Sequence, residues 1–332
     1  LEDFSIVQSP STQADDMAKV STRRSSSTDA LATPGEVLNF VSMNQQGDWL
    51  ARQTRPDLSM LVSTSQQKMP SPTAGDIRQG NLLVKKAQHY SELALTYHSI
   101  PCDQLSFLLH TDYSSKEASN MGHPQGGYII GAANKDMEKG FCAPWAPAVW
   151  RSYRVRRVVD STLSGESSCL IDGLGHLEWL LSFFAFGFFR GFTVENRDRF
   201  IDKFQAVVVI DCKSVYDHIC KTDLEQLRLH LDHSGRAAPE TASERFDDET
   251  LRRMGQCGPG TYRHSTHTTD CSPYGMIDKE CARNLAIAKR SLSRMSAALR
   301  WGPTSLMLAD GLTKDKAEPS DLLRACIRHG VY

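Results

Sequence analysis

Four acidic residues stand at positions from which their side chains could converge. Asp112 and Asp211 each follow an apolar run, LSFLLHT and AVVVI, so each is predicted to end a strand. Glu166 is predicted to lie in the first turn of a long helix, and Asp310 is predicted to open the last helix. Carboxylate oxygens that meet at one point can hold two divalent cations, and such a pair hydrolyses phosphodiesters. The four residues are therefore candidate metal ligands and catalytic groups.

Taken one at a time, these acids have a plainer interpretation. The chain contains 39 Asp and Glu residues, and most acidic side chains in proteins are solvated surface charges. Asp211 is the exception, because an acid after a strand that is apolar along its whole length often borders a ligand crevice. Residue type and spacing alone leave both a metal site and an ordinary charged surface open.

Arginines form a second group with chemical potential. Just before the helix that carries Glu166, basic residues alternate with an aromatic and an aliphatic residue: Arg151, Arg154, Arg156 and Arg157, interleaved with Tyr153 and Val155. Arginines in this pattern can contact backbone phosphates, which dominate nucleic-acid affinity, or they can line a solvated strand edge. The formal net charge is only -1, so a nucleic-acid site has to be local. Their place beside the candidate acids favours phosphate contact.

The remaining chemistry-bearing residues give weaker patterns. Nine cysteines are scattered without a CxxC pair, and no secretory signal pattern begins the sequence, which is typical of reduced thiols inside a cell. A tract holding Cys257, His264, His267 and Cys271 has no recognisable zinc spacing and is interpreted as loop. The apolar stretch 179–189 falls well short of the roughly 20 residues that span a bilayer, so we expect a buried helix and no membrane partner.

The elements that must position the acids follow from hydrophobic periodicity. Residues 1–35 are rich in Ser and Thr and poor in aromatics, which predicts a disordered lead-in. A helical pattern interrupted by prolines occupies 36–100, and three strands with tight connections follow within 105–152, as in an antiparallel meander.

The second half of the chain is predicted to alternate helices and strands. A helix capped by Ser164 runs to about Leu180, a buried strand covers 206–210, and a further helix starts near Lys213. Residues 231–275 lack periodicity and are interpreted as a long inserted loop. The chain closes with a helix over 278–299, a short strand or extended segment around 301–307 and the turn LADGLTK.

Four blocks of this sequence resemble, in the same order, those of the ribonuclease H domains of Ty1/copia-type retrotransposons. The blocks are TDYS (111–114), WRSYRVRRVVDSTLSGESSCLIDGLGHLEWL (150–180), VIDCKSVYD (209–217) and LADGLTKD (308–315). Upstream, GDWLARQTRPDLSMLVSTSQQ (47–67) is similar to the end of the reverse transcriptase in the same polyprotein family. The resemblance therefore extends over roughly residues 36–332.

The resemblance implies a ribonuclease H-like α/β fold, with a mixed five-stranded sheet flanked by helices over 101–332 and a loop insertion at about 231–275. Residues 36–100 would be a helical remnant of the reverse transcriptase connection. Asp112, Glu166, Asp211 and Asp310 would be the catalytic residues and the ligands of two Mg²⁺ ions, for which Mn²⁺ could substitute.

The activity implied is endonucleolytic hydrolysis of the RNA strand of an RNA:DNA hybrid, in a cytoplasmic particle or the nucleus. The partners would be that hybrid and the reverse transcriptase portion of the polyprotein. The sequence departs from the family at three places. Ser167 and Ser168 follow Glu166, a long span separates Asp211 from Asp310, and no His stands in the stretch RWGPTSLMLAD that ends at Asp310. The polymerase's aromatic-x-Asp-Asp turn between apolar strands is also missing, so we expect no polymerase activity. The alternative is a decayed or repurposed copy that binds nucleic acid or polyprotein partners without cleaving.

Overall fold

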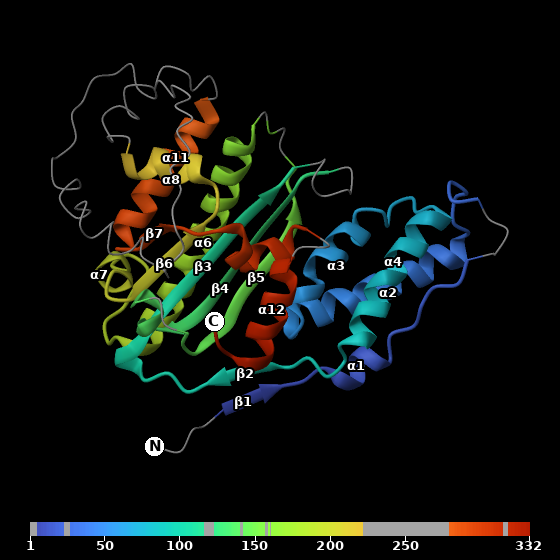
Figure 1. The fold of residues 1–332 in the computed structure, drawn as a ribbon, viewed down its shortest axis with the longest axis horizontal. Coiled ribbons are helices and arrows are strands. Elements are labelled where there is room, and N and C mark those ends of the chain that lie inside the picture. Colours follow the sequence, from blue (N-terminus) through green and yellow to red (C-terminus); the bar gives the residue numbers. More distant parts are fainter. Residues whose placement is uncertain are drawn as a thin grey trace.

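The computed structural model describes residues 5–22, 27–115, 123–139, 142–156, 159, 161–221, 279–314 and 318–332. In these ranges a mixed β-sheet is covered by helices on both faces, and a separate group of helices lies at one edge of the sheet (Figure 1). The predicted insertion at 231–275 lies outside the described residues, as do Arg157 and the tract from Cys257 to Cys271.

The sheet has five strands in the order β5-β4-β3-β6-β7. Its strands are β3 (Leu105–Ser114), β4 (Gln125–Asn134), β5 (Trp145–Arg154), β6 (Gln205–Ile210) and β7 (Ala298–Trp301). The first three pair antiparallel, whereas β6 lies parallel to β3 and β7 lies parallel to β6. The predicted α/β class with a mixed five-stranded sheet that starts with three antiparallel strands is confirmed.

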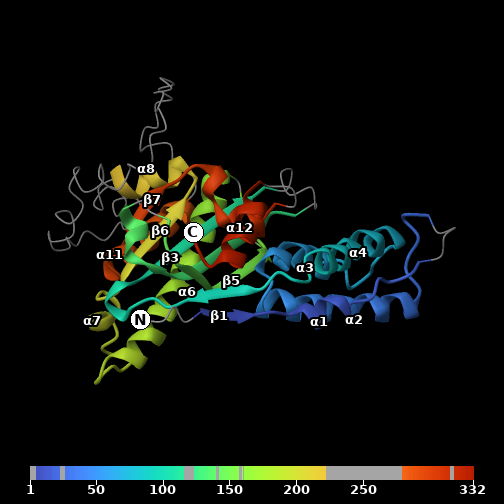
Figure 2. The ribbon, with the colours of Figure 1, turned by 60° about the horizontal axis from the view of Figure 1, so that its bottom comes forward.

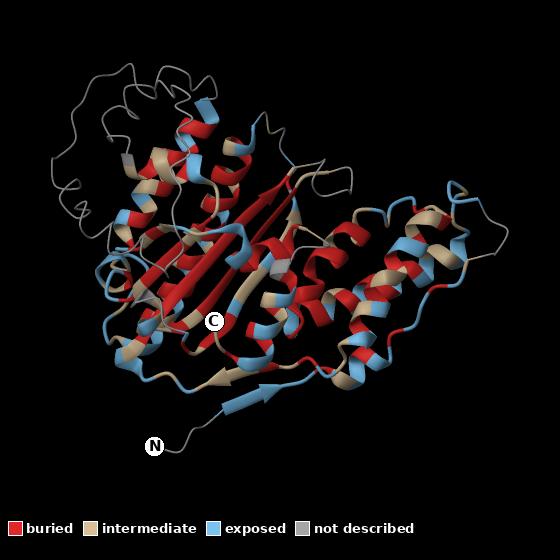
Figure 3. Ribbon diagram, viewed as in Figure 1, coloured by how far each residue is buried: buried red, intermediate tan, exposed pale blue. Residues whose placement is uncertain are grey.

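Alternation along the central strand β3 builds a hydrophobic core on each face of the sheet. Phe107 and Leu109 pack against the side covered by the helices α6 (Thr162–Phe188), α8 (Lys213–Lys221) and α11 (Lys279–Arg294). Leu108 points the other way, toward α12 (Glu318–His329) and the 3-10 turn η6 (Leu308–Leu312). Every residue of β3 is therefore buried (Figure 3), as expected for a strand covered on both faces.

Helix α6 begins earlier and ends later than predicted. Its N-cap is Ser161, whose hydroxyl accepts a hydrogen bond from the Ser164 amide, so Glu166 lies in the second turn and the prediction of Ser164 as the cap is wrong. The helix continues to Phe188.

The expectation that the apolar stretch 179–189 is a buried helix is wrong in part. Within this stretch Leu181 and Ala185 are buried in the core, whereas Trp179 and Phe183, on another face of the helix, are 60% and 61% exposed and stack on each other. By length and composition α6 could cross a membrane, and it is the one such helix among the described residues. Its packing against the strands accounts for that apolar composition as a core helix.

The helices at the sheet edge form a unit with its own core. They are α2 (Pro34–Gln53), the 3-10 turn η1 (Pro56–Leu58), α3 (Ser59–Gln66) and α4 (Ala74–His89). Thr33 and Thr73 start α2 and α4 with capping boxes. The unit is attached to β5 by the Trp150 indole, which donates a 2.7 Å hydrogen bond to the Ala51 carbonyl, and Figure 2 shows it extending from that edge.

The expectation of a disordered lead-in over residues 1–35 is wrong for the described part of that segment. β1 (Ser5–Gln8) pairs with β2 (Leu95–His98), and α1 (Ser11–Asp15) follows. Three apolar residues spaced three apart, Ala14, Met17 and Val20, are buried in the core of the helical unit. The average composition of the segment does not reveal these few apolar residues. They suffice to order the segment because they bury apolar surface against helices that are already packed together.

The C-terminal elements also differ from the prediction. α11 ends at Arg294, and the following strand β7 ends at Trp301, where the predicted short strand or extended segment was expected to begin. Asp310 lies in η6 and does not open the last helix, because α12 starts only at Glu318. The remaining short elements are η2 (Cys102–Gln104), η3 (Lys135–Lys139), α7 (Asp198–Ile201) and η5 (Thr304–Leu306).

A fully buried ion pair holds the helical unit together. The Arg55 guanidinium binds both carboxylate oxygens of Asp57, at 2.8 and 3.0 Å, and neither side chain is exposed. The same guanidinium donates to the Tyr90 carbonyl at 2.9 Å, which ties η1 to the end of α4. The buried Arg55 charge is therefore satisfied by protein groups rather than by water.

We predict that Asp57→Asn lowers the free energy of unfolding by about 3–5 kcal/mol, because it leaves a buried guanidinium without its counter-charge. The matched control is Asp48→Asn, which breaks the pair with Arg52, whose side chain is 73% exposed, and should cost no more than about 0.5 kcal/mol. Urea unfolding of the two variants measures both changes. Equal losses would show that the buried pair has no special weight.

Candidate metal centre

Asp112 and Asp211 lie at the same end of the sheet. Asp112 is near the C-terminal end of β3, Asp211 directly follows β6, and these two strands are adjacent and parallel, so their C-terminal ends meet. Glu166 reaches the same point from α6. Ligand oxygens of Asp112, Glu166 and Asp211 all lie within 4.8 Å of one another, a spacing at which they could hold a metal ion.

Small residues allow Glu166 to come this close to β3. A Cβ on Gly165 would lie 2.6 Å from the Tyr113 ring, and one on Gly173 would lie 2.6 Å from the Thr111 methyl group. The two glycines thus let α6 lie directly on the strand that carries Asp112. The position of Glu166 is a consequence of close helix-to-sheet packing.

Asp310 enters the centre from the opposite face. It lies in η6, which packs on β4 at Gly127, where an added Cβ would meet the Leu312 and Thr313 side chains at 2.9 Å. Asp310 is 1% exposed, and its carboxylate is connected to Asp112 through Lys314. The Lys314 ammonium lies 2.8 Å from Asp310 Oδ1 and 3.5 Å from Asp112 Oδ2.

The four predicted site acids therefore come together, although not symmetrically. Three of them form a compact ligand triad, and Asp310 joins through an ammonium group.

Sequence reasoning missed the residues that hold these acids. The Thr313 hydroxyl donates a short hydrogen bond to Asp112 Oδ2, and the Thr304 hydroxyl donates to Asp211 Oδ2 at 2.9 Å. Lys314 was visible only as a basic residue four positions after Asp310, a spacing that favours ion pairing on a turn or helix.

Burial and mutual repulsion raise the proton affinity of the centre. The pKa of Glu166 is raised well above its ordinary value, first by burial and then by the charges of Asp112 and Asp211. Burial and then Asp112 raise the pKa of Asp310 to about 7, and the same two causes raise the pKa of Asp211. Carboxylates this close together favour the binding of a positive charge, which can be a proton, an ammonium group or a metal ion.

The donor set indicates the kind of metal that fits. All four acids offer hard carboxylate oxygens, and no cysteine or histidine belongs to the triad, which suits Mg²⁺, Mn²⁺ or Ca²⁺ better than zinc.

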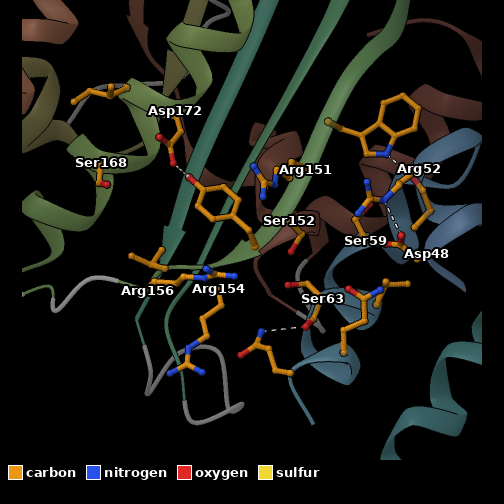
Figure 4. A pocket seen from close by; sticks show the side chains of 18 of the residues that line it. Asp48, Arg52, Ser59, Ser63, Arg151, Ser152, Arg154, Arg156, Ser168 and Asp172 are labelled. Atoms are coloured by element: carbon orange, nitrogen blue, oxygen red, sulfur yellow. Dashed lines mark hydrogen bonds and ion pairs between the residues drawn. The ribbon is translucent and has the colours of Figure 1, made fainter. Parts of the chain in front are cut away.

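The predicted arginines lie along a cavity beside this centre. Arg151, Arg154 and Arg156 line a space of about 1180 Å³ between β5, the helical unit and α11, where Arg52 and Arg283 also contribute (Figure 4). In the sheet register Asp112 pairs with Gly127 and Gly127 pairs with Ser152, which also lines the cavity. The cavity thus begins two strands away from Asp112, at roughly 10 Å.

Comparison of the chain with protein-family models, with curated proteins and with solved structures finds no match. The function of the centre is therefore argued from the sequence blocks and from the geometry of the residues that form it.

We predict that the metal-free protein loses stability as the pH rises toward 7. The pKa of Asp310 is about 7 in the folded state against 3.8 ordinarily, so the folded state holds this proton more tightly than the unfolded chain does. The stabilisation from that proton is present at low pH and is lost as the pH rises from about 4 through 7.

Thermal unfolding in EDTA across this pH range measures the loss. Asp310→Asn should flatten the fall, whereas Asp321→Asn, whose side chain is 79% exposed, should leave it unchanged. An equally steep fall in Asp310→Asn would mean that the proton is held elsewhere.

Proposed function

We propose that this chain is a ribonuclease of the H type, which hydrolyses the RNA strand of an RNA:DNA hybrid with divalent cations held by Asp112, Glu166, Asp211 and Asp310. The observation that carries the proposal is the approach of three carboxylates to within 4.8 Å, although they come from three segments far apart in the chain. A five-stranded mixed sheet with three antiparallel strands first is compatible with that fold. The four sequence blocks that resemble the Ty1/copia domains contain all four acids, which adds independent support.

The roles of the acids follow from their positions. Asp112, Glu166 and Asp211 would hold one cation, and Asp112 together with Asp310 would hold a second, with Mg²⁺ the expected ion and Mn²⁺ a substitute. Such cations activate a water molecule and stabilise negative charge on the phosphate, giving 5′-phosphate and 3′-hydroxyl products. Because Asp112 belongs to both groups, its loss would disable both.

The arginine-lined cavity supports a double-stranded substrate. Arg151, Arg154 and Arg156 are exposed on one wall, and Arg52 of α2 faces them from the helical unit (Figure 4). A duplex with one strand at the carboxylates could place its second strand's phosphates near these guanidinium groups, since β5 lies two strands, roughly 10 Å, from β3. Duplexes with A-like geometry are recognised mainly through shape, 2′-hydroxyls and phosphates, for which arginine is suited.

The helical unit has a part in this proposal. As the proposed remnant of the reverse transcriptase connection, it would form one wall of the substrate cavity and face the polymerase portion of the same polyprotein. The enzyme would then act in a cytoplasmic particle or the nucleus, where the hybrid is made.

We predict that the protein cleaves the labelled RNA strand of a hybrid in Mg²⁺ and that Asp211→Asn lowers the rate at least about 100-fold, because an amide is a poor ligand for a hard cation. In EDTA the same variant should be as stable as the wild type or slightly more stable, since it removes one of several repelling charges.

Asp321→Asn on α12 serves as the control and should cleave normally. Wild-type protein that binds the hybrid without cutting it would indicate the decayed or repurposed binding protein. Unchanged cleavage by Asp211→Asn would exclude the carboxylates as ligands.

We also predict that Arg154→Gln and Arg52→Gln each weaken hybrid binding in EDTA and reduce the slope of log affinity against log salt by about one, the change expected for one lost phosphate contact. Arg328→Gln changes an exposed arginine on α12 and should leave both quantities unaltered. Fluorescence anisotropy at several salt concentrations provides the measurement. Equal effects of all three variants would point to general charge rather than to the cavity.

A further inference from the structure

Lys314 reaches from the solvent edge into the acidic centre. Its ammonium lies 2.8 Å from Asp310 Oδ1 and 3.5 Å from Asp112 Oδ2. The two acids are nearly inaccessible, at 2% and 1% side-chain exposure, whereas the lysine side chain is 29% exposed. The ammonium therefore lies among the acids while part of the lysine side chain remains accessible to water.

The charge of Lys314 acts on the centre as a whole. It lowers the pKa of Glu166, Asp211 and Asp310, against the burial and the neighbouring carboxylates that raise them. An ammonium in this position offsets a part of the repulsion that the four acids impose on the fold. In the part of the chain that the structure describes, it is the basic group that touches two of the candidate ligands.

Lys314 contacts Asp112 and Asp310, whereas the ligand triad joins Asp112 to Glu166 and Asp211. Asp112 contributes to both, because its carboxylate belongs to the triad and also faces the ammonium. Asp310 is outside the triad, and its Oδ1 is bound to Lys314. A cation between Asp112 and Asp310 would therefore compete directly with the ammonium for its oxygens, whereas a cation in the triad has two further carboxylates, Glu166 and Asp211, to bind.

We propose that Lys314 is a built-in counter-ion of this centre, which occupies the Asp112–Asp310 side when no divalent cation is bound there and is displaced when one binds. The inference rests on the proposed function, since it takes the carboxylates to be cation ligands. An ammonium and a divalent cation need the same oxygens and repel each other at this range. The flexible four-carbon stem allows the ammonium to withdraw into solvent without movement of the backbone.

The counter-ion makes cation binding stepwise. The triad side is open to the first cation, and the second must compete with a tethered ammonium whose local concentration is high. Lys314 therefore lowers the affinity for the second cation, and in exchange it stabilises the fold when metal is scarce. A residue that merely packed at this position would produce neither effect.

Mn²⁺ titration of the EDTA-stripped full chain at pH 8.5, which disfavours protons as competitors, tests the inference by calorimetry. We expect the wild type to bind in two steps, and Lys314→Met to tighten the weaker step at least about tenfold, since a single charge at this range shifts ion affinity by one or more powers of ten. Lys68→Met is the matched control, because Lys68 also faces a carboxylate, at 3.8 Å in the helical unit, and should behave as the wild type.

Thermal unfolding supplies a second readout. In EDTA, Lys314→Met should melt at a lower temperature than Lys68→Met, and excess Mn²⁺ should raise its melting temperature by more. Should Lys314→Met fail to fold, Lys314→Arg keeps the charge and should bind the second Mn²⁺ no more tightly than the wild type. An unchanged or weaker second step in Lys314→Met, or a tighter one in Lys314→Arg, would overturn the inference. A wild-type protein that binds no Mn²⁺ would instead overturn the proposed function.

Discussion

Repulsion among buried carboxylates is the constraint around which this fold is arranged. Asp112, Glu166 and Asp310 are each no more than 6% exposed, and the charge of Asp112 raises the pKa of Glu166 and of Asp310. The fold tolerates this because each acid is held by a different element, with β3 and β6 parallel and adjacent, α6 on one face and η6 on the other. Thr313 and Lys314 supply donors in compensation. A buried cluster that is costly without a cation is a cluster prepared to bind one.

The close packing that gathers the acids also sets the position of the cavity. Gly126 and Gly127 let α6 and η6 pack closely on opposite faces of β4, the strand that separates the metal centre on β3 from β5. β5 in turn carries the helical unit, through Trp150 and through the contact of α3 with its C-terminal half. The arginines of β5 and of α2 therefore line one cavity although the two elements pack on separate hydrophobic cores.

Errors of prediction occurred where a contact between distant segments overrides the local pattern. The lead-in appears too polar to fold, yet Asn81 donates to the Val20 carbonyl and accepts from its amide, at 2.9 and 2.8 Å, and fixes it on α4. The end of α6 has the composition of a buried helix, yet Phe186 is 73% exposed while its neighbour Ala185 is buried, because the two side chains lie on different faces of the helix. The sequence around Asp310 has a helix-start pattern, but Asp310 lies in the 3-10 turn η6, which packs on β4 and precedes the actual helix.

Local patterns alone predicted the strands β3, β4, β5 and β6, the antiparallel start of the sheet and the four candidate acids, because strand ends and apolar runs persist whatever surrounds them. They did not predict β1 and β2, which lie in segments expected to be disordered and helical. The hydrogen bonds and ion pairs that hold the acids depend on the tertiary structure. Thr313 binds Asp112 across 201 residues of chain, and Lys314 occupies a position that exists only after β3 and η6 have packed together. Contacts between remote segments set the strand order, the cavity wall that α2 contributes and the position of the Lys314 counter-ion. The energies of these contacts depend on burial, which no local sequence pattern specifies.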